Sequence, residues 1–298
     1  MALKKLLLTA VAAVSLTGAL SAQNFDNVEI KAVSLRGNIH VLFGAGGNIG
    51  VSAGEDGVFI IDDQFAPLTD RIKAAIAKIS DQPIRYAINT HFHGDHTGGN
   101  ENLGNSGTVV VAHDNVRQRL SEGAFIKAFN NKMEPQPKAA LPVITFNDEM
   151  SLFLNGEEAR IIHSANGHTD GDSFIYFKGA NLIHMGDLFF NELFPFIDVD
   201  SGGSIDGMIM GVNKALAMAD GETIIIPGHG PVTDKAGLTA YRAMLQETRD
   251  IVAGLKEKGM SLEDIQAAKP IEAYKEKWKS FEPTWSDKYL GFIYASIK

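Results

Sequence analysis

The chain of 298 residues contains no cysteine, which excludes disulfide bonds and thiolate metal ligands. It has no basic stretch either. Its 36 acidic residues outnumber its 27 lysines and arginines, which leaves a formal net charge of −9. A surface with this charge repels nucleic acid. We therefore expect no nucleic acid partner.

The sequence also lacks an N-terminal apolar run long enough to span a membrane, since the run there covers only 6–20. Lys4 and Lys5 precede this run and small residues follow at 21–22, which is the layout of a secretory signal peptide. No cysteine is present for a lipid anchor. We expect residues 1–22 to be a signal peptide and the mature chain to be secreted or periplasmic, with a net charge of −11 once the two lysines are removed.

The mature chain has the length of one sizeable enzyme. Hydrophobic residues make up 45% of the sequence, enough to bury one large core or two modest ones. The chain contains no low-complexity linker and no clear repeat. We predict that residues 23–298 form a single domain with a C-terminal helical extension, and the sequence indicates no particular oligomeric state.

The pattern of apolar residues predicts strands followed by helices in each half of the chain. In the first half, the expected strands are 28–33, 40–43, 49–53, 57–62, 84–89 and 108–112, with helices at 67–79 and after residue 113. In the second half, they are 150–154, 159–163, 173–177, 182–185 and 222–226, with helices at 204–218 and 235–258. This order is expected of two sheets packed face to face with helices outside, an α+β fold with four αββα layers.

One short segment brings three imidazoles and a carboxylate into six positions: His91, His93, Asp95 and His96. The strand expected at 84–89 delivers them on a loop. Alternate residues of an extended chain share a face, so the first two histidines can converge on one ion, and the last two residues can point to a neighbouring position. Imidazole nitrogen and carboxylate oxygen are typical zinc ligands, whereas calcium and magnesium prefer mostly oxygen. The segment therefore predicts a zinc site.

Here the chain resembles the metallo-β-lactamase superfamily of hydrolases, whose first signature is a His-x-His-x-Asp-His loop after a strand. Three later segments match in the right order: Gly167-His168-Thr169, Met185-Gly186-Asp187 and Pro227-Gly228-His229-Gly230. Taken singly, each later segment is also typical of a turn. Their order behind the first cluster favours metal ligands, and the resemblance spans about 28–251.

The resemblance implies an αββα sandwich of the metallo-β-lactamase type with two zinc ions. It places one ion on His91, His93 and His168. It places the second on Asp95, His96 and His229, with Asp187 bridging the two. Two close zinc ions lower the pKa of a shared water, and they polarise a substrate carbonyl. In this interpretation Asp95 orients the bridging hydroxide and accepts a proton.

The expected function is a secreted, zinc-dependent, β-lactamase-like hydrolase that attacks the carbonyl of a small-molecule lactam or a related ester or amide. The alternative is a glyoxalase II-like thioesterase or lactonase. Such enzymes carry a bridging aspartate like Asp187, whereas typical zinc β-lactamases carry cysteine or serine in that segment. The glutathione thioester of glyoxalase II is cytosolic, which disagrees with the expected export.

Two further interpretations stay open with less support, and a serine mechanism is rejected. Di-iron oxygen or nitric oxide reductases of this superfamily characteristically have glutamate where this chain has His93. A non-catalytic metal-binding protein is the second of these, but the ligand set in this sequence is complete, which disfavours it. Ser52 lies in a Gly-x-Ser-x-Gly segment, but a strand follows it instead of the helix that a nucleophilic serine requires.

Several residues outside the ligand motifs have expected roles. We expect His163 and His184 to lie at the edge of the core or directly behind the ligands, and Asp170 and Asp172 to orient His168 or its neighbours through hydrogen bonds. The phenylalanine-rich segment 189–196 is either an apolar wall beside the metals or ordinary core. Residues 123–142 are a candidate lid, 44–48 a hairpin turn, and the tail with both tryptophans, Trp278 and Trp285, packs against the sandwich.

Overall fold

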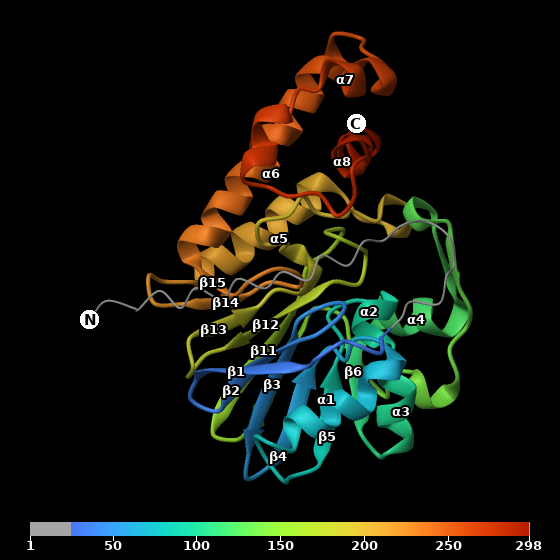
Figure 1. Cartoon of the computed structure of the whole chain (residues 1–298). Helices are drawn as coiled ribbons and strands as arrows, with labels where there is room; N and C mark the ends of the chain where they lie inside the picture. The colour runs from blue at the N-terminus through green and yellow to red at the C-terminus, as the bar shows by residue number, and fades with distance from the viewer. Residues whose placement is uncertain (1–24, 298) are drawn as a thin grey trace.

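Two β-sheets packed face to face form the centre of the molecule, with helices on both outer sides (Figure 1). This computed structural model describes residues 25–297, so the expected signal peptide lies outside the described residues. The four-layer αββα prediction is confirmed.

The first sheet has seven strands in the order β1-β2-β3-β4-β5-β6-β9. Their bounds are β1 Lys31–Arg36, β2 Ile39–Phe43, β3 Ile49–Gly54, β4 Gly57–Ile61, β5 Ile84–Ile88, β6 Val109–His113 and β9 Ile144–Phe146. Strands β1 to β4 form an antiparallel meander, and β4, β5, β6 and β9 are parallel. Strand β1 begins at Lys31 instead of residue 28 because its partner β2 ends at Phe43, opposite Lys31.

The second sheet has six strands in the order β10-β11-β12-β13-β14-β15. Their bounds are β10 Glu149–Leu154, β11 Glu157–His163, β12 Ser173–Phe177, β13 Leu182–His184, β14 Ile224–Ile226 and β15 Thr233–Asp234. Only β13 and β14 are parallel. Strand β14 is shorter than expected because Thr223 forms a turn with Asp220, leaving residues 224–226 to pair with β13.

Apolar side chains from both sheets meet between them. Phe59 of β4 stacks on Phe177 of β12 with ring centroids 5.9 Å apart, and Ile88 and Ile175 belong to the same buried cluster. Strand β11 alternates buried and partly exposed residues, as a strand with one core face must. This cluster holds the two sheets in register, so the strand ends of both sheets lie along one edge.

Helices cover the outer face of each sheet (Figure 1). The elements around the first sheet are η1 Ala66–Leu68, α1 Thr69–Ile76, α2 Gly94–Thr97, α3 Asn100–Asn105 and α4 Asp114–Glu122. Helices α5 Ile205–Met218 and α6 Lys235–Glu257 cover the second sheet. Ser204 caps α5 as expected, because its hydroxyl accepts a hydrogen bond from the backbone N–H of Gly207.

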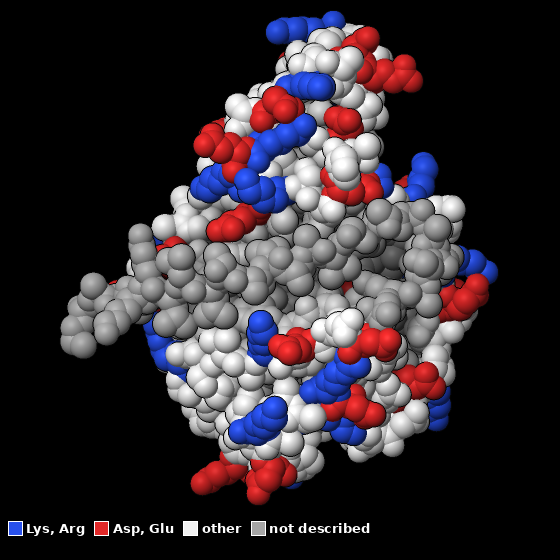
Figure 2. All heavy atoms as spheres, viewed as in Figure 1, with Lys and Arg blue, Asp and Glu red and all other residues white. Residues whose placement is uncertain are grey.

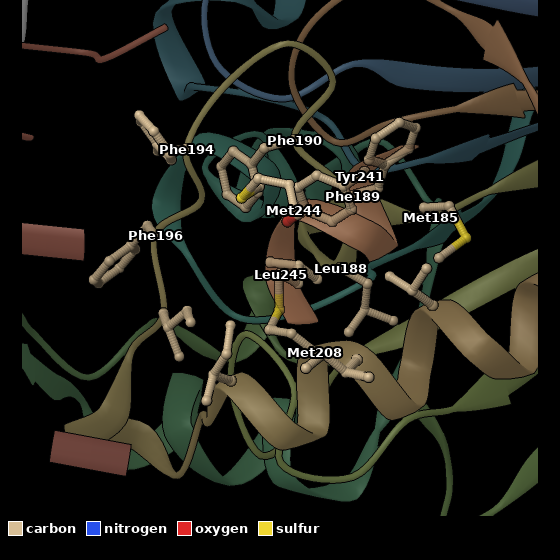
Figure 3. Packing of buried hydrophobic residues seen from close by; sticks show 14 of the residues in the cluster. Met185, Leu188, Phe189, Phe190, Phe194, Phe196, Met208, Tyr241, Met244 and Leu245 are labelled. Carbon is tan, nitrogen blue, oxygen red and sulfur yellow. The ribbon is translucent and has the colours of Figure 1, made fainter. Parts of the chain in front are cut away.

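The C-terminal extension packs on the helix layer of the second sheet. It comprises α7 Leu262–Ala268, η6 Glu272–Glu276 and α8 Trp285–Ser296. Tyr289 of α8 is buried and its hydroxyl lies 2.8 Å from Thr248 Oγ1 of α6. The extension therefore shares the core with α5 and α6, part of which Figure 3 shows.

Residues 123–142 contain the hairpin β7 Ala124–Ile126 and β8 Asn131–Met133 with η2 Lys127–Phe129 between its strands, followed by η3 Lys138–Ala140. The helices of the described residues include none that is long and apolar enough to cross a membrane. On the face in Figure 2, acidic and basic side chains are interspersed along the visible helices.

Candidate metal centre

All seven expected ligands lie along the edge where strands of both sheets end. Strand β5 ends just before His91 and His93, and Asp95 and His96 sit in the short helix α2. The other three follow or precede strands of the second sheet: His168 before β12, Asp187 in η4 Gly186–Leu188 after β13, and His229 after β14. The sandwich thus brings together residues far apart in the sequence.

Three imidazoles converge at one end of the site. His93 Nδ1 lies 3.1 Å from His91 Nε2 and 2.9 Å from His168 Nε2. All three side chains are buried. Together these three imidazoles form a group that could hold a metal ion.

A second group with a carboxylate lies beside the first. His96 Nε2 is 3.3 Å from His229 Nε2, and Asp95 Oδ2 is 3.3 Å from His229 Nε2 and 3.6 Å from His96 Nε2. This group can also hold a metal ion. Asp95 and His229 have side chains 27% and 18% exposed, so the site opens to solvent on their side.

Asp187 lies between the two groups. Its Oδ2 is 3.5 Å from His168 Nε2 and 3.3 Å from His229 Nε2, so one oxygen faces both positions. The other oxygen, Oδ1, is buried and lies 3.1 Å from His96 Nε2, but it accepts no hydrogen bond because His96 donates through Nδ1 to Asp62. A Cβ atom at Gly228 would lie 2.1 Å from Oδ1, so glycine there lets the backbone approach the carboxylate.

Outward hydrogen bonds fix the tautomers of four ligand histidines. Asp198 Oδ2 accepts from His93 Nε2 at 3.0 Å, and Asp62 Oδ2 accepts from His96 Nδ1 at 2.8 Å. The remaining two contacts are His168 Nδ1 to the carbonyl of Phe196 at 2.9 Å and His91 Nδ1 to Thr90 Oγ1 at 3.0 Å. Thr90 Oγ1 donates its own proton to Asp62, so it accepts from His91.

These tautomers leave a lone pair on each nitrogen that faces the centre. The lone pair of His93 lies 3.1 Å from that of His91 and 2.9 Å from that of His168; lone pairs cannot hydrogen-bond one another, and a cation between them satisfies all three. The buried, unpartnered Oδ1 of Asp187 has the same need. The residues therefore fit bound metal.

The pKa values differ between the two groups in the metal-free protein. Burial lowers the pKa of His168 to about 4, so that imidazole is neutral at pH 7. Burial opposes the charge on His229, but Asp187 and Asp95 raise its pKa to about 9. For Asp95, burial is outweighed by His96 and His229, which lower its pKa to about 2.

Sequence reasoning missed the two carboxylates that hold His93 and His96. Asp62 directly follows the buried strand β4, a position at which an acidic residue needs a specific partner. Asp198 follows the apolar segment 189–197 in the same way. An acidic residue at the end of an apolar run was the signal available in both cases.

Of the two aspartates expected to orient His168, only Asp172 contacts its segment. Asp172 accepts hydrogen bonds from the backbone N–H groups of His168 and Thr169 and from the Thr169 hydroxyl. Burial raises the pKa of Asp172 to about 8. Asp170 instead pairs with Arg119 through two hydrogen bonds of 2.7 and 2.8 Å, so its expected role is wrong.

Other polar residues lie outside the ligand groups. His184 is buried and its Nε2 lies 3.0 Å from the carbonyl of Asn48. His163 stacks on His113 at 3.8 Å. Ser52 lies inside β3, where Asn38 and Asn155 donate to it, so it has none of the surroundings of a nucleophile.

The two loops beside the ligands pack tightly. The segment 44–48 is a packed turn: Asn48 donates to the carbonyls of Pro227 and Gly230, and Gly47 lies against the ring of His96. In the phenylalanine-rich segment, Phe190 stacks on His229 with centroids 5.2 Å apart, and Phe196 stacks on His93 at 5.6 Å. This segment is therefore part of the apolar core and also packs against the ligand side chains.

The sequence profile of the metallo-beta-lactamase superfamily matches residues 43–229. Among curated proteins, the chain is 23% identical to the lactamase-like protein aptB of Emericella nidulans, over 81% of this chain and 76% of that protein. It is 25% identical to the probable metallo-hydrolase YqgX of Bacillus subtilis, over 49% of this chain and 68% of that protein.

Solved structures share the fold. The metallo-beta-lactamase from Pontibacter korlensis has 15% identity and a TM-score of 0.60, covering 73% of this chain and 99% of its own. The sec-alkylsulfatase Pisa1 from Pseudomonas sp. has 16% identity and a TM-score of 0.66, covering 89% of this chain and 50% of its own. With its sequence profile matched across more than half of its length, this chain belongs to the metallo-beta-lactamase superfamily of metallo-hydrolases.

Proposed function

We propose that the protein is an exported, zinc-dependent hydrolase that cleaves a lactam or a related ester or amide bond. The observation that carries this proposal is the convergence of five histidines and two aspartates on two adjacent positions. Nitrogen and carboxylate ligands without thiolate suit zinc. Two zinc ions bound here would supply a water of lowered pKa and a Lewis acid for the substrate oxygen.

The chain's own residues supply positioning and proton transfer. Asp95 is the most exposed of the ligand carboxylates and its pKa of about 2 keeps it ionised at neutral pH. An ionised carboxylate at this position can orient the attacking water and take up its proton. Asp187 is buried between the two positions and would hold an ion at each.

The test is a hydrolysis panel on the zinc-loaded mature protein with a chromogenic lactam, a thioester, a lactone and an alkyl sulfate ester. We expect chelator-sensitive turnover of a carbonyl substrate, and a loss in kcat of roughly 10²–10⁴ in Asp95→Asn. Asp200→Asn, at an exposed site nearby, is the matched control. No carbonyl turnover with two zinc ions bound would overturn the proposal.

A thioesterase or lactonase is the second candidate. Asp187 favours it, because an aspartate that faces both metal positions is typical of glyoxalase II-like enzymes. Preference for a thioester or lactone over the lactam by orders of magnitude would select this candidate. Metal analysis of the purified protein separates zinc from the iron of a redox member.

Export is tested separately. The full chain, expressed with a C-terminal tag, is expected in the periplasm with Gln23 as its first residue, whereas a chain lacking residues 1–22 stays in the cytoplasm. N-terminal sequencing of the fractionated protein decides this point. Recovery of the unprocessed chain from the cytoplasm would contradict it.

A further inference from the structure

Aromatic side chains from three separate segments line one side of the metal centre. We call this set the aromatic wall, and its members are Phe129, Phe190, Phe196, Phe281 and Trp285. Phe129 comes from the hairpin region, the next two from the segment after β13, and the last two from the C-terminal extension. The labelled rings of Phe190 and Phe196 lie in the cluster of Figure 3.

The wall contacts ligands of both metal positions. At one end, Phe190 stacks on His229 with an interplanar angle of 12°, and Phe281 lies 6.2 Å from the ring of His229. At the other end, Phe196 stacks on His93 with an angle of 23°. A layer of aromatic rings therefore runs along the ligands from one group to the other.

Trp285 joins the two ends. Its ring lies 4.9 Å from Phe281, 5.8 Å from Phe129 and 6.3 Å from Phe196. Its Nε1 donates to the carbonyl of Phe194 at 2.9 Å, which fixes the indole. The wall is thus one packed layer with a fixed shape.

Parts of this layer are exposed where the site opens. Trp285 and Phe190 are buried, but Phe129 and Phe281 are each partly exposed. Phe281 lies beside His229, which with Asp95 marks the solvent-facing side of the centre. A substrate that reaches the metals from this side passes an apolar aromatic surface.

The charged groups at the wall neutralise one another. Lys288 lies over the rings of Phe129 and Trp285, and its Nζ is 2.7 Å from Glu282 Oε1. Lys288 also donates to the carbonyl of Ala128, which ties the hairpin region to α8. The pair leaves no net charge there to attract an ionic substituent.

Two members of the wall lie in the extension, outside the part of the chain that the superfamily profile matches. Phe281 and Trp285 lie beyond residue 229, where the match to the superfamily profile ends. The structure from Pontibacter korlensis covers 73% of this chain although 99% of its own length is matched. The extension therefore adds residues to the site as well as to the core.

We propose that the aromatic wall binds a hydrocarbon group of the substrate next to the bond that is cleaved. This inference rests on the proposed hydrolase function for the reaction itself. Its occupant is an aliphatic chain or aromatic ring attached to the anionic or carbonyl group that the metals engage. Burial of apolar surface against Phe129 and Phe281 supplies the binding free energy.

The test measures binding without turnover. Straight-chain carboxylates from butanoate to decanoate are titrated into the zinc-loaded protein by calorimetry. We expect the affinity to rise about fourfold for each added methylene, the value for full burial. In Phe281→Ala and Phe129→Ala we expect a gain below about twofold for each methylene, with zinc content unchanged.

Two controls isolate the wall. Phe153→Ala removes an aromatic side chain that is 72% exposed on β10 and is expected to keep the full chain-length dependence. Phe281→Leu keeps an apolar side chain and is expected to retain most of the gain. The inference would be overturned if the affinity did not depend on chain length, or if the gain in affinity for each methylene were equal in all variants.

The outcome separates the inference from the proposed function. If long carboxylates bind with the expected slope but no carbonyl substrate is hydrolysed, the wall stands and the hydrolase proposal fails. If short and long acyl substrates bind and react equally well, the hydrolase stands and the wall fails.

Discussion

At the residue scale, four of the expected ligand histidines each have their tautomer fixed by a hydrogen bond to one oxygen atom. The carboxylates of Asp198 and Asp62 act on different metal positions, through His93 and His96. Hydrogen bonds of this kind orient a ligand and raise its basicity. Removing one of these oxygens therefore tests one position at a time.

We expect Asp198→Asn to weaken metal binding at the position of His91, His93 and His168 by roughly 10- to 100-fold. The amide carries no charge and supports the imidazole less well. Zinc retained after dialysis against graded chelator measures the change. Asp200→Asn changes an exposed carboxylate two residues away and is expected to bind zinc like the wild type.

A second residue-scale prediction concerns the glycine that faces His96. A Cβ atom at Gly47 would lie 2.1 Å from His96 Cε1, and Asp62 holds this imidazole in place. We expect Gly47→Ala to displace His96, to weaken zinc binding at least about tenfold and to cost about 1–3 kcal/mol of stability.

Gly94→Ala is the matched control for that variant. It lies inside the ligand loop, but an added Cβ meets nothing within 4 Å. We expect normal zinc content, measured by elemental analysis. Equal zinc loss in both variants would show that the loop tolerates no side chain at all and would contradict the specific clash.

At the scale of elements, the ends of β6 and β11 are joined by stacked histidines. His113 ends β6 in the first sheet and His163 ends β11 in the second, with centroids 3.8 Å apart and planes 11° apart. Burial lowers the pKa of both imidazoles. The neighbouring ring of His113 also lowers the pKa of His163.

We expect this stack to weaken as the pH falls. Since the folded-state pKa values lie below the unfolded value of about 6.5, the stabilisation is complete above that pH and is lost as the pH falls through the folded values. Asp148 opposes and Lys214 reinforces the shift of His163. The urea midpoint is therefore expected to fall between pH 7.5 and 5.5.

The variant His163→Phe isolates this contribution, because it keeps a stacked ring without a titrating nitrogen. Its urea midpoint should depend less on pH than that of the wild type. Titration of the ligand histidines affects both proteins and cancels in the comparison. Identical pH dependence in the two proteins would rule out the stack as the source.

At the scale of the whole molecule, the metal centre and the apolar core contribute separately to stability. The cluster between the sheets contains Phe59, Ile88 and Phe177 and none of the expected ligands. The ligands lie outside it at one edge. We therefore expect the metal-free protein to stay folded but to be less stable.

Removal of zinc is expected to lower Tm on the order of 10 °C, because a ligand at 1,000 times its Kd adds about 4 kcal/mol. Far-UV circular dichroism at 25 °C should stay the same. In His168→Ala the shift between zinc-loaded and chelated protein should be clearly smaller. A chelated wild type that melts at the zinc-loaded temperature would be inconsistent with this arrangement.

The fold was largely predictable because both sheets follow local apolar patterns. The strands at 40–43, 173–177 and 182–185 and the cap at Ser204 were predicted within a residue or so. Errors occurred where an element ends for lack of a partner, as in β1 and β14. The end of such a strand depends on the length of its pairing partner, which the local sequence does not determine.

Residue type and spacing predict the candidate ligands of the first motif, whereas those of the three later motifs follow from the resemblance to the superfamily. Their outer partners Asp62 and Asp198, the different role of Asp170, and the approach of Phe281 to His229 were decided only by the tertiary structure. These contacts join segments from different sheets and from the extension. Packing of the whole chain sets such distances, and no local pattern encodes them.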